Sequence, residues 1–151
     1  MIKVNVEIDN KGWFTQIKYP KRYFNAKVKK ISKIIKFFKN RNITFTILLT
    51  NSLNMKKLNK KFKGKNKPTD VLSFPSFLLK NLKLITKKKA YIGDIAISYE
   101  IILSRSKKKS FLAEFDKVWI HGLLHLVGYN HIKKFDYYKM DKAEKKILSL
   151  I

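Results

Sequence analysis

The three histidines of this chain all lie in one short segment, His121-Gly-Leu-Leu-His-Leu-Val-Gly-Tyr-Asn-His131. His121 and His125 are four positions apart, so on a helix their imidazoles project from the same face, one turn apart. At that spacing two ring nitrogens can reach one metal ion. Gly128 stands where a helix commonly ends in a left-handed residue, and a sharp turn there would bring His131 back toward the other two. The segment therefore predicts one zinc ion per chain, held by His121, His125 and His131.

A lone histidine on an apolar helix face is usually a core or surface residue, and two at this spacing can arise by chance. Three in one segment and none elsewhere favour a metal site. Three protein ligands leave a fourth position open to water, which is typical of catalytic zinc, whereas structural zinc usually has four protein ligands. Zinc lowers the pKa of the water it holds to near 7 and acts as a Lewis acid, so phosphodiester and peptide hydrolysis both remain open. Imidazoles also accept nickel and copper, so the spacing does not identify the metal.

The spacing also matches the H-x-x-x-H-x-x-G-x-x-H pattern of the metzincin metalloproteases, which carry a glutamate directly after the first histidine as general base. Here that position is Gly122. Peptide hydrolysis needs the carboxylate to activate water and to protonate a poor leaving amine. An RNA phosphodiester has a better leaving group and a neighbouring 2′-hydroxyl that can itself be the nucleophile. The missing glutamate therefore favours RNA over peptide as the substrate.

The histidine segment resembles the signature H-G-x-L-H-L-x-G-Y-D-H of the YbeY endoribonucleases, the bacterial ribosomal RNA maturation factors. Two more stretches resemble this family in the same order: Leu58-Asn59 through Lys67-Pro-Thr-Asp-Val-Leu-Ser-Phe-Pro75, and Ile92-Gly-Asp-Ile-Ala-Ile-Ser98. The resemblance implies an α+β fold with a small mixed β-sheet flanked by helices. It also implies zinc on the three histidines and single-strand-specific, zinc-dependent cleavage of RNA. The expected role is 16S ribosomal RNA 3′-end maturation and ribosome quality control, with RNA and the small ribosomal subunit as partners.

Two positions depart from the family pattern. Asn130 replaces the aspartate that usually precedes the third histidine. It could orient a ligand imidazole or cap the next helix, and we favour the cap. Lys63 replaces an arginine thought to act on the substrate; it keeps the charge but cannot grip a phosphate with two parallel bonds. We expect Lys63 to stabilise charge on the scissile phosphate, the alternative being one more solvated lysine. Asp70 and Asp94 are possible polar neighbours of the site, and neither is taken as a catalytic base.

The chain has 35 lysines and arginines against 10 acidic residues, a formal net charge of +25. So basic a chain is typical of proteins that bind polyanions, nucleic acid first among them. Lysines near the loop at 56–67 offer a path for an RNA backbone, and Phe62 and Tyr129 could stack on unpaired bases, as could Phe74 if it is not in the core. The alternative is nucleotide bias in the coding genome, because lysine, asparagine and isoleucine are abundant while glycine and proline are scarce.

Other features of the composition bear on the compartment. The absence of cysteine excludes disulfides and thiolate metal sites. The start of the chain alternates apolar and polar residues, unlike a signal peptide, and no apolar run approaches the roughly 18–20 residues of a membrane span. An anionic membrane surface is a weaker candidate partner, because the lysines are not confined to one amphipathic helix. These features favour a cytoplasmic enzyme with no membrane partner, and they say nothing of its oligomeric state.

Hydrophobic periodicity predicts the elements that must position these residues, within one domain over residues 1–151. Strands are expected at 2–8, 43–49, 71–74 (ended by Pro75) and 91–98 (with a bulge or close approach at Gly93), with a loop at 63–70 and a mobile connection over 76–89. Helices are expected at 20–38, 52–62 (capped by Ser52), 111–127 (capped by Ser110) and 134–150. The buried helix faces should comprise Val28, Ile31, Ile35 and Phe38, then Phe111, Phe115, Val118 and Leu124, then Tyr137, Met140, Ile147 and Leu148. Interleaved strands and helices followed by helices indicate an α/β or α+β domain on one sheet.

Overall fold

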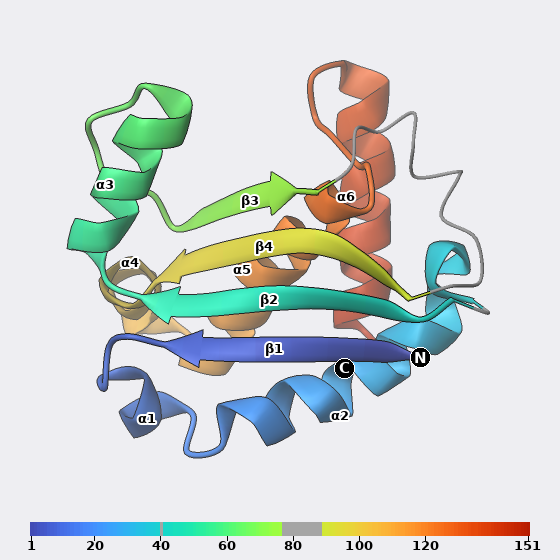
Figure 1. Ribbon diagram of the computed structural model, residues 1–151, viewed down its shortest axis with the longest axis horizontal. Coiled ribbons are helices and arrows are strands. Elements are labelled where there is room, and N and C mark those ends of the chain that lie inside the picture. The colour runs from blue at the N-terminus through green and yellow to red at the C-terminus, as the bar shows by residue number, and fades with distance from the viewer. Residues whose placement is uncertain (40, 77–88) are drawn as a thin grey trace.

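The computed structural model describes residues 1–39, 41–76 and 89–151 and is built on one four-stranded sheet (Figure 1). The parallel pairs are β1 with β2 and β2 with β4, while β3 runs antiparallel to β4 at one edge. A mixed sheet is therefore present, and the α+β prediction is confirmed. The strands, in their spatial order, are β1 (Ile2–Ile8), β2 (Ile43–Thr50), β4 (Ala90–Ser98) and β3 (Val71–Pro75).

Helices surround this sheet, and α5 and α6 lie behind it in Figure 1. Over the described ranges, no helix is long and apolar enough to cross a membrane. The short α1 was not predicted; its Trp13 is fully buried and donates its indole N–H to the Thr50 carbonyl at 3.0 Å. The helices are α1 (Trp13–Gln16), α2 (Pro20–Ile34), α3 (Ser52–Lys63), α4 (Tyr99–Arg105), α5 (Phe111–Leu126) and α6 (Lys134–Leu148), with 3₁₀ turns η1 (Lys36–Phe38) and η3 (Ser106–Lys108).

Both faces of the sheet carry apolar side chains, because successive residues of a strand point to opposite faces and both sets include apolar residues. The larger cluster joins alternate residues of β1 and β2, such as Val4 and Phe45, to the helices behind the sheet. The predicted buried residues of α2 and α5 belong to it, with Ile35 only partly buried. A smaller cluster of Met55, Leu72 and Ala96 lies between α3, β3 and β4. This second cluster holds the first half of α3 against the sheet, while Phe62, next to Lys63, contacts Phe74 of the edge strand.

Gly93 of β4 lies where β4 and the edge strand β3 approach each other closely, as predicted. The pairing of β4 with β2 shifts register between Thr44 and Thr46, opposite this glycine. Its φ is +133°, and a Cβ added to it would lie 2.2 Å from the Phe74 carbonyl oxygen. Only a residue without a side chain fits both conditions.

Several predicted boundaries were wrong by a few residues. Helix α2 ends at Ile34 because Ile35 takes an extended conformation, and Phe38 reaches the core through the 3₁₀ turn instead. The cap of α3 is Asn51, whose side chain accepts the Asn54 N–H at 2.9 Å. Asparagine and serine are equally good caps, and the Ser52 hydroxyl hydrogen-bonds Ser98 instead.

At the other end of the chain, α6 stops at Leu148, not Leu150. Its Tyr137 is exposed, not buried, although Met140 and Ile147 are buried as expected and Leu148 packs against the core. The helix shows only a narrow apolar stripe to the core, and Tyr137 falls outside it. The connection predicted at 76–89 falls almost wholly on residues 77–88, which lie outside the described residues.

A buried carboxylate joins α2 to α5. Asp116 accepts hydrogen bonds from the Tyr23 hydroxyl at 2.6 Å and the Trp119 indole at 2.8 Å, and it forms an ion pair with Lys27. Burial, and then the bond to Asp116, raises the pKa of Tyr23, so this hydroxyl stays a donor. The network satisfies every polar group it buries among the described residues.

Asp116→Ala is expected to destabilise the protein by about 3 kcal/mol, because removing one partner of a buried ion pair leaves the other donors uncompensated. Urea unfolding measures the change. Tyr23→Phe removes one donor and leaves the carboxylate paired, so it should cost about 1 kcal/mol. Equal losses for the two variants would contradict a central role for Asp116.

Candidate metal centre

The C-terminal end of α5 is shaped to bring the histidines together. Gly128 has φ +94°, and its N–H donates to the His125 carbonyl at 3.1 Å, while the Tyr129 N–H donates to the Leu124 carbonyl at 3.0 Å. These two bonds define a Schellman motif, which ends a helix and reverses the chain. The predicted role of Gly128 is therefore confirmed, and the reversal carries His131 back beside α5.

The three imidazoles form one cluster, as the spacing predicted. The ring centroids of His121 and His125 are 4.6 Å apart. The ring centroid of His131 lies 5.5 Å from that of His121 and 5.0 Å from that of His125. One ligand atom from each residue lies within 4.8 Å of the other two, so the cluster could bind a metal ion. His121 and His125 are half-buried, whereas His131 is exposed.

The hydrogen bonds of two imidazoles fix which nitrogens face the centre. His121 donates from Nδ1 to the Glu144 carboxylate at 2.6 Å, and His125 donates from Nδ1 to the Tyr129 carbonyl at 3.0 Å. A neutral imidazole carries one N–H, so both Nε2 atoms present lone pairs. These Nε2 atoms are 3.0 Å apart. Two lone pairs at that distance repel unless a proton or a metal cation lies between them, and with the third imidazole beside them the donor set fits a metal ion.

The electrostatics of His125 also favour a metal ligand. Burial, and then the charges of His121 and His131, lower the pKa of His125 to about 4. The imidazole is therefore neutral at pH 7, and a ring nitrogen must be unprotonated to bind a metal. No proton needs to be displaced from this ligand at neutral pH.

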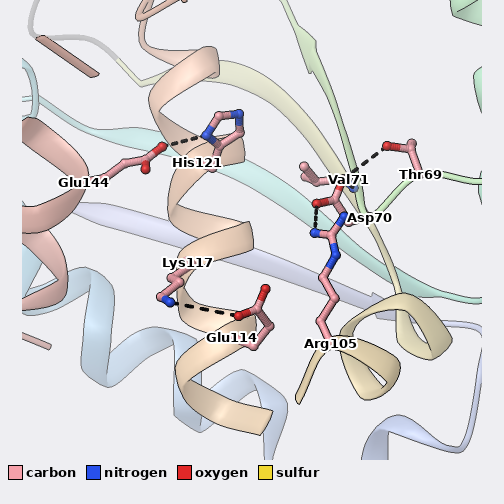
Figure 2. Close-up of polar contacts among 8 residues, drawn as sticks. All are labelled: Thr69, Asp70, Val71, Arg105, Glu114, Lys117, His121 and Glu144. Atoms are coloured by element: carbon pink, nitrogen blue, oxygen red, sulfur yellow. Dashed lines mark hydrogen bonds and ion pairs between the residues drawn. The ribbon is translucent and has the colours of Figure 1, made fainter. Parts of the chain in front are cut away.

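Glu144 of α6 is the residue of this centre that sequence analysis missed. It reaches across from α6 to His121 on α5, as Figure 2 shows. A carboxylate that accepts the N–H of the ring nitrogen not bound to the metal fixes the orientation of a ligand histidine. The expected capping role of Asn130 was wrong: the cap position of α6 is Lys133, and the Asn130 side chain instead accepts the Ile132 N–H at 3.4 Å.

Glu144→Ala is expected to weaken zinc binding by about 10–100-fold, because His121 loses the partner that orients it. Competition with a chromophoric chelator measures the affinity. Asp141→Ala is the matched control, since Asp141 is on the same helix but pairs with Lys145. If both variants bind zinc like the parent protein, Glu144 has no part in the metal centre.

A cleft of about 1070 Å³ lies in front of the histidines. Lys63, the predicted phosphate-binding residue, lines it from the end of α3, and Arg105 lines it from the end of α4. Asp70 also lines the cleft, but its carboxylate already has two partners. It forms an ion pair with Arg105 (Figure 2) and accepts the Val71 N–H at 2.8 Å. Asp94 is not among the lining residues and accepts the Tyr91 hydroxyl instead. The cleft is therefore mainly cationic.

Of the three candidate stacking residues, Tyr129 lines the cleft. Phe62 is exposed and lies edge-to-face on Phe74, with ring centroids 5.0 Å apart. Phe74 itself packs against the smaller core cluster, which was the alternative considered for it.

The position of the metzincin glutamate faces the sheet, not the cleft. Gly122 is buried, and a Cβ added to it would lie 2.8 Å from the Ile95 side chain and 3.2 Å from the Ser73 hydroxyl. The Ser73 hydroxyl donates to the Gly122 carbonyl at 3.1 Å. No side chain can extend from this position without moving α5 away from the sheet.

Comparisons with known proteins identify a family and a shared fold. A family model described as "Endoribonuclease YbeY" matches residues 7–151. A protein of that name from Pelagibacter ubique is 46% identical, over 100% of this chain and 97% of that protein. Another from Bartonella bacilliformis is 33% identical, over 100% and 94%. The solution structure of TM1509 from Thermotoga maritima shares the fold, with a TM-score of 0.61 and 24% identity over 99% of this chain and 87% of that one.

Proposed function

Because the chain belongs to the family of YbeY endoribonucleases, enzymes that hydrolyse phosphodiester bonds of RNA, we propose that it cleaves single-stranded RNA in the cationic cleft in a zinc-dependent reaction. His121, His125 and His131 are the proposed metal ligands, with one ion per chain. The observation that carries the proposal is the pair of Nε2 lone pairs 3.0 Å apart at the wall of the cleft. The proposed catalytic unit is one domain over residues 1–151.

The residues of the chain have separable roles in this proposal. Zinc, when bound, supplies Lewis-acid activation of water and of the phosphate. Glu144 and the Tyr129 carbonyl hold the ligand imidazoles in place, so their Nε2 atoms need no reorganisation. Lys63 attracts the scissile phosphate, and Arg105 lines the same cleft as a cation paired with Asp70. Zinc is preferred to nickel or copper because three histidines and an open position are typical of catalytic zinc.

The biological role extends the proposal. The substrate is ribosomal RNA, in 16S 3′-end maturation and ribosome quality control, with the small ribosomal subunit as partner and the cytoplasm as compartment. The family name and the net charge of +25 support an RNA partner of this kind.

Two other functions fit the structure less well. A metzincin-like peptidase needs a carboxylate after the first histidine, and Gly122 has no space for one. An assembly factor with structural zinc needs a closed metal site, and the described residues supply only three grouped ligands. The endoribonuclease hypothesis requires neither feature.

The direct test is cleavage of a labelled single-stranded RNA by the purified protein, with and without a chelator and after zinc is added back. Cleavage that the chelator stops and zinc restores supports the proposal. Chelator-resistant cleavage would contradict the metal-dependent mechanism. Zinc bound at one ion per chain without any cleavage would favour the assembly-factor hypothesis.

Lys63→Ala is expected to lower the cleavage rate about tenfold, since an exposed cation in a cleft is partly screened by water. Single-turnover kinetics at saturating enzyme measure the rate. Lys61→Ala is the matched control, because Lys61 is exposed on the same helix but does not line the cleft. Lys63→Arg should retain or improve the rate. A parent-like rate for Lys63→Ala would remove this residue from the mechanism.

A further inference from the structure

Large apolar side chains gather on the surface directly after the metal centre. Within the stretch from Ile132 to Tyr138, Ile132 is 85% exposed, Phe135 65%, and Tyr137 and Tyr138 62% each. Single exposed apolar residues are ordinary, but a contiguous group marks an interaction site. Neither the fold nor the proposed metal chemistry uses this group.

Two of these aromatic residues share one face of α6 with two lysines. Phe135, Tyr138, Lys139 and Lys142 follow the i, i+3, i+4, i+7 spacing of a single helix face, and we call them the α6 patch. The four line a hollow of about 570 Å³. The Lys139 ammonium lies 4.2 Å from the centroid of the Phe135 ring. One carboxylate, Asp136, also lines the hollow, so cations outnumber anions there.

The α6 patch adjoins the catalytic cleft. Tyr129 and Asn130 line both the hollow and the cleft that contains the histidines. An extended strand that leaves the metal centre on this side therefore passes over Tyr129 onto the aromatic rings. The two sites are also close in sequence, since α6 begins at Lys134, three residues after His131.

We propose that the α6 patch binds unpaired nucleotides of the RNA strand that flanks the cleaved bond. Phe135 and Tyr138 stack on bases, and Lys139 and Lys142 neutralise phosphates. Aromatic faces beside cations are how proteins bind single strands without reading their sequence. Paired bases are already stacked within a duplex, so the patch selects for single strands. The proposal rests on the proposed function, because its ligand is the same RNA strand.

The first experiment measures binding, which does not depend on cleavage. The zinc-loaded full chain is titrated into a labelled 2′-O-methyl oligouridylate of about twelve nucleotides, within the site size of single-strand binding proteins. Joint replacement Phe135→Ala and Tyr138→Ala should weaken binding at least about tenfold. The dependence of affinity on salt should stay unchanged, because both lysines remain. Both side chains are exposed, so the urea midpoint should also stay unchanged.

Tyr19→Ala is the matched control. Tyr19 is 60% exposed and has the Lys18 ammonium 5.4 Å from its ring centroid, so it offers the same chemistry elsewhere. It lies between α1 and α2, at the opposite corner of Figure 1 from the start of α6. This variant should bind the oligonucleotide like the parent protein.

A second measurement reports stacking itself. Phe135→Trp places an indole in the patch, and its fluorescence should be quenched when the oligouridylate binds. The two native tryptophans, Trp13 and Trp119, are fully buried and should respond little. Purely electrostatic binding would leave the new indole unquenched and would overturn the proposal.

The outcomes separate this proposal from the proposed function. Unchanged affinity of the double variant would overturn the proposal and favour a protein partner for the patch. An equal loss in Tyr19→Ala would also overturn it, because RNA binding would then not be specific to the patch. Loss of binding confined to the double variant supports it, even if the parent protein cleaves no RNA. If the parent protein cleaves RNA but the double variant binds it equally well, the proposed function stands and only the role of the α6 patch is rejected.

Discussion

His125→Ala should bind no zinc at stoichiometric concentration and should cleave single-stranded RNA at least about a thousandfold more slowly than the parent protein. A Lewis-acid metal contributes several kcal/mol to a transition state, and each 1.4 kcal/mol is a factor of about ten in rate. His125 supplies one of the two converging Nε2 atoms, so its loss leaves no pair of lone pairs to hold the ion. Elemental analysis after dialysis gives the zinc content, and single-turnover kinetics give the rate.

His131→Ala is the informative companion to this variant. Its side chain is exposed and has no hydrogen-bond partner among the described residues, so its removal breaks no hydrogen bond there and loses only contacts with the other two imidazoles. His125→Ala, in contrast, also removes the bond to the Tyr129 carbonyl. If both variants lose zinc and cleavage while their urea midpoints remain near that of the parent, the loss is due to the metal and not to unfolding. Undiminished cleavage by either variant would exclude that histidine as a ligand.

The metal centre was predictable from sequence to the extent that its geometry is local. His121 and His125 share a helix turn, and Gly128 ends that helix, so spacing alone brings three imidazoles together. The cap at Ser110 and the bulge at Gly93 were predictable for the same reason, because each depends on one residue and its neighbours.

Contacts between distant elements were not predictable. Glu144 is 23 positions from His121, and nothing in its own helix distinguishes it from other acidic residues on α6 until α6 packs on α5. The pairing of Arg105 with Asp70 depends likewise on α4 reaching the start of β3. Asn130 was misassigned because asparagine is a favoured cap residue, although the helix begins at Lys134, as predicted, and its cap position is Lys133.

Gly122→Glu, which completes the metzincin pattern, is expected to unfold the protein and not to create a peptidase. Adding side-chain atoms where a Cβ already meets Ile95 at 2.8 Å is overpacking, which costs about 1–3 kcal/mol. Burying an unpaired carboxylate costs several kcal/mol more. The sum approaches the whole stability of an ordinary domain, about 5–15 kcal/mol. Circular dichroism and urea unfolding measure the outcome.

Two variants of the same helix isolate the cause. Ala113→Glu makes a comparable change at an exposed position in the first turn of α5, where a negative charge is favourable, and should leave stability unchanged. Gly122→Ala should cost only about 1 kcal/mol, because its better helix propensity offsets part of the overpacking. A folded Gly122→Glu protein that hydrolyses peptides would instead revive the metzincin hypothesis.

Gly122→Ala also tests why a glycine stands beside the first ligand. The glycine lets α5 lie against β3 and β4, with its carbonyl bonded to the Ser73 hydroxyl. His121 projects from the neighbouring position toward Glu144. We therefore expect the depth of the Gly122 contact to affect how the imidazole is held. A methyl group that lifts α5 by a few tenths of an ångström should therefore weaken zinc binding more than its small cost in stability suggests. Metal affinity unchanged in a folded Gly122→Ala protein would show that the contact serves packing alone.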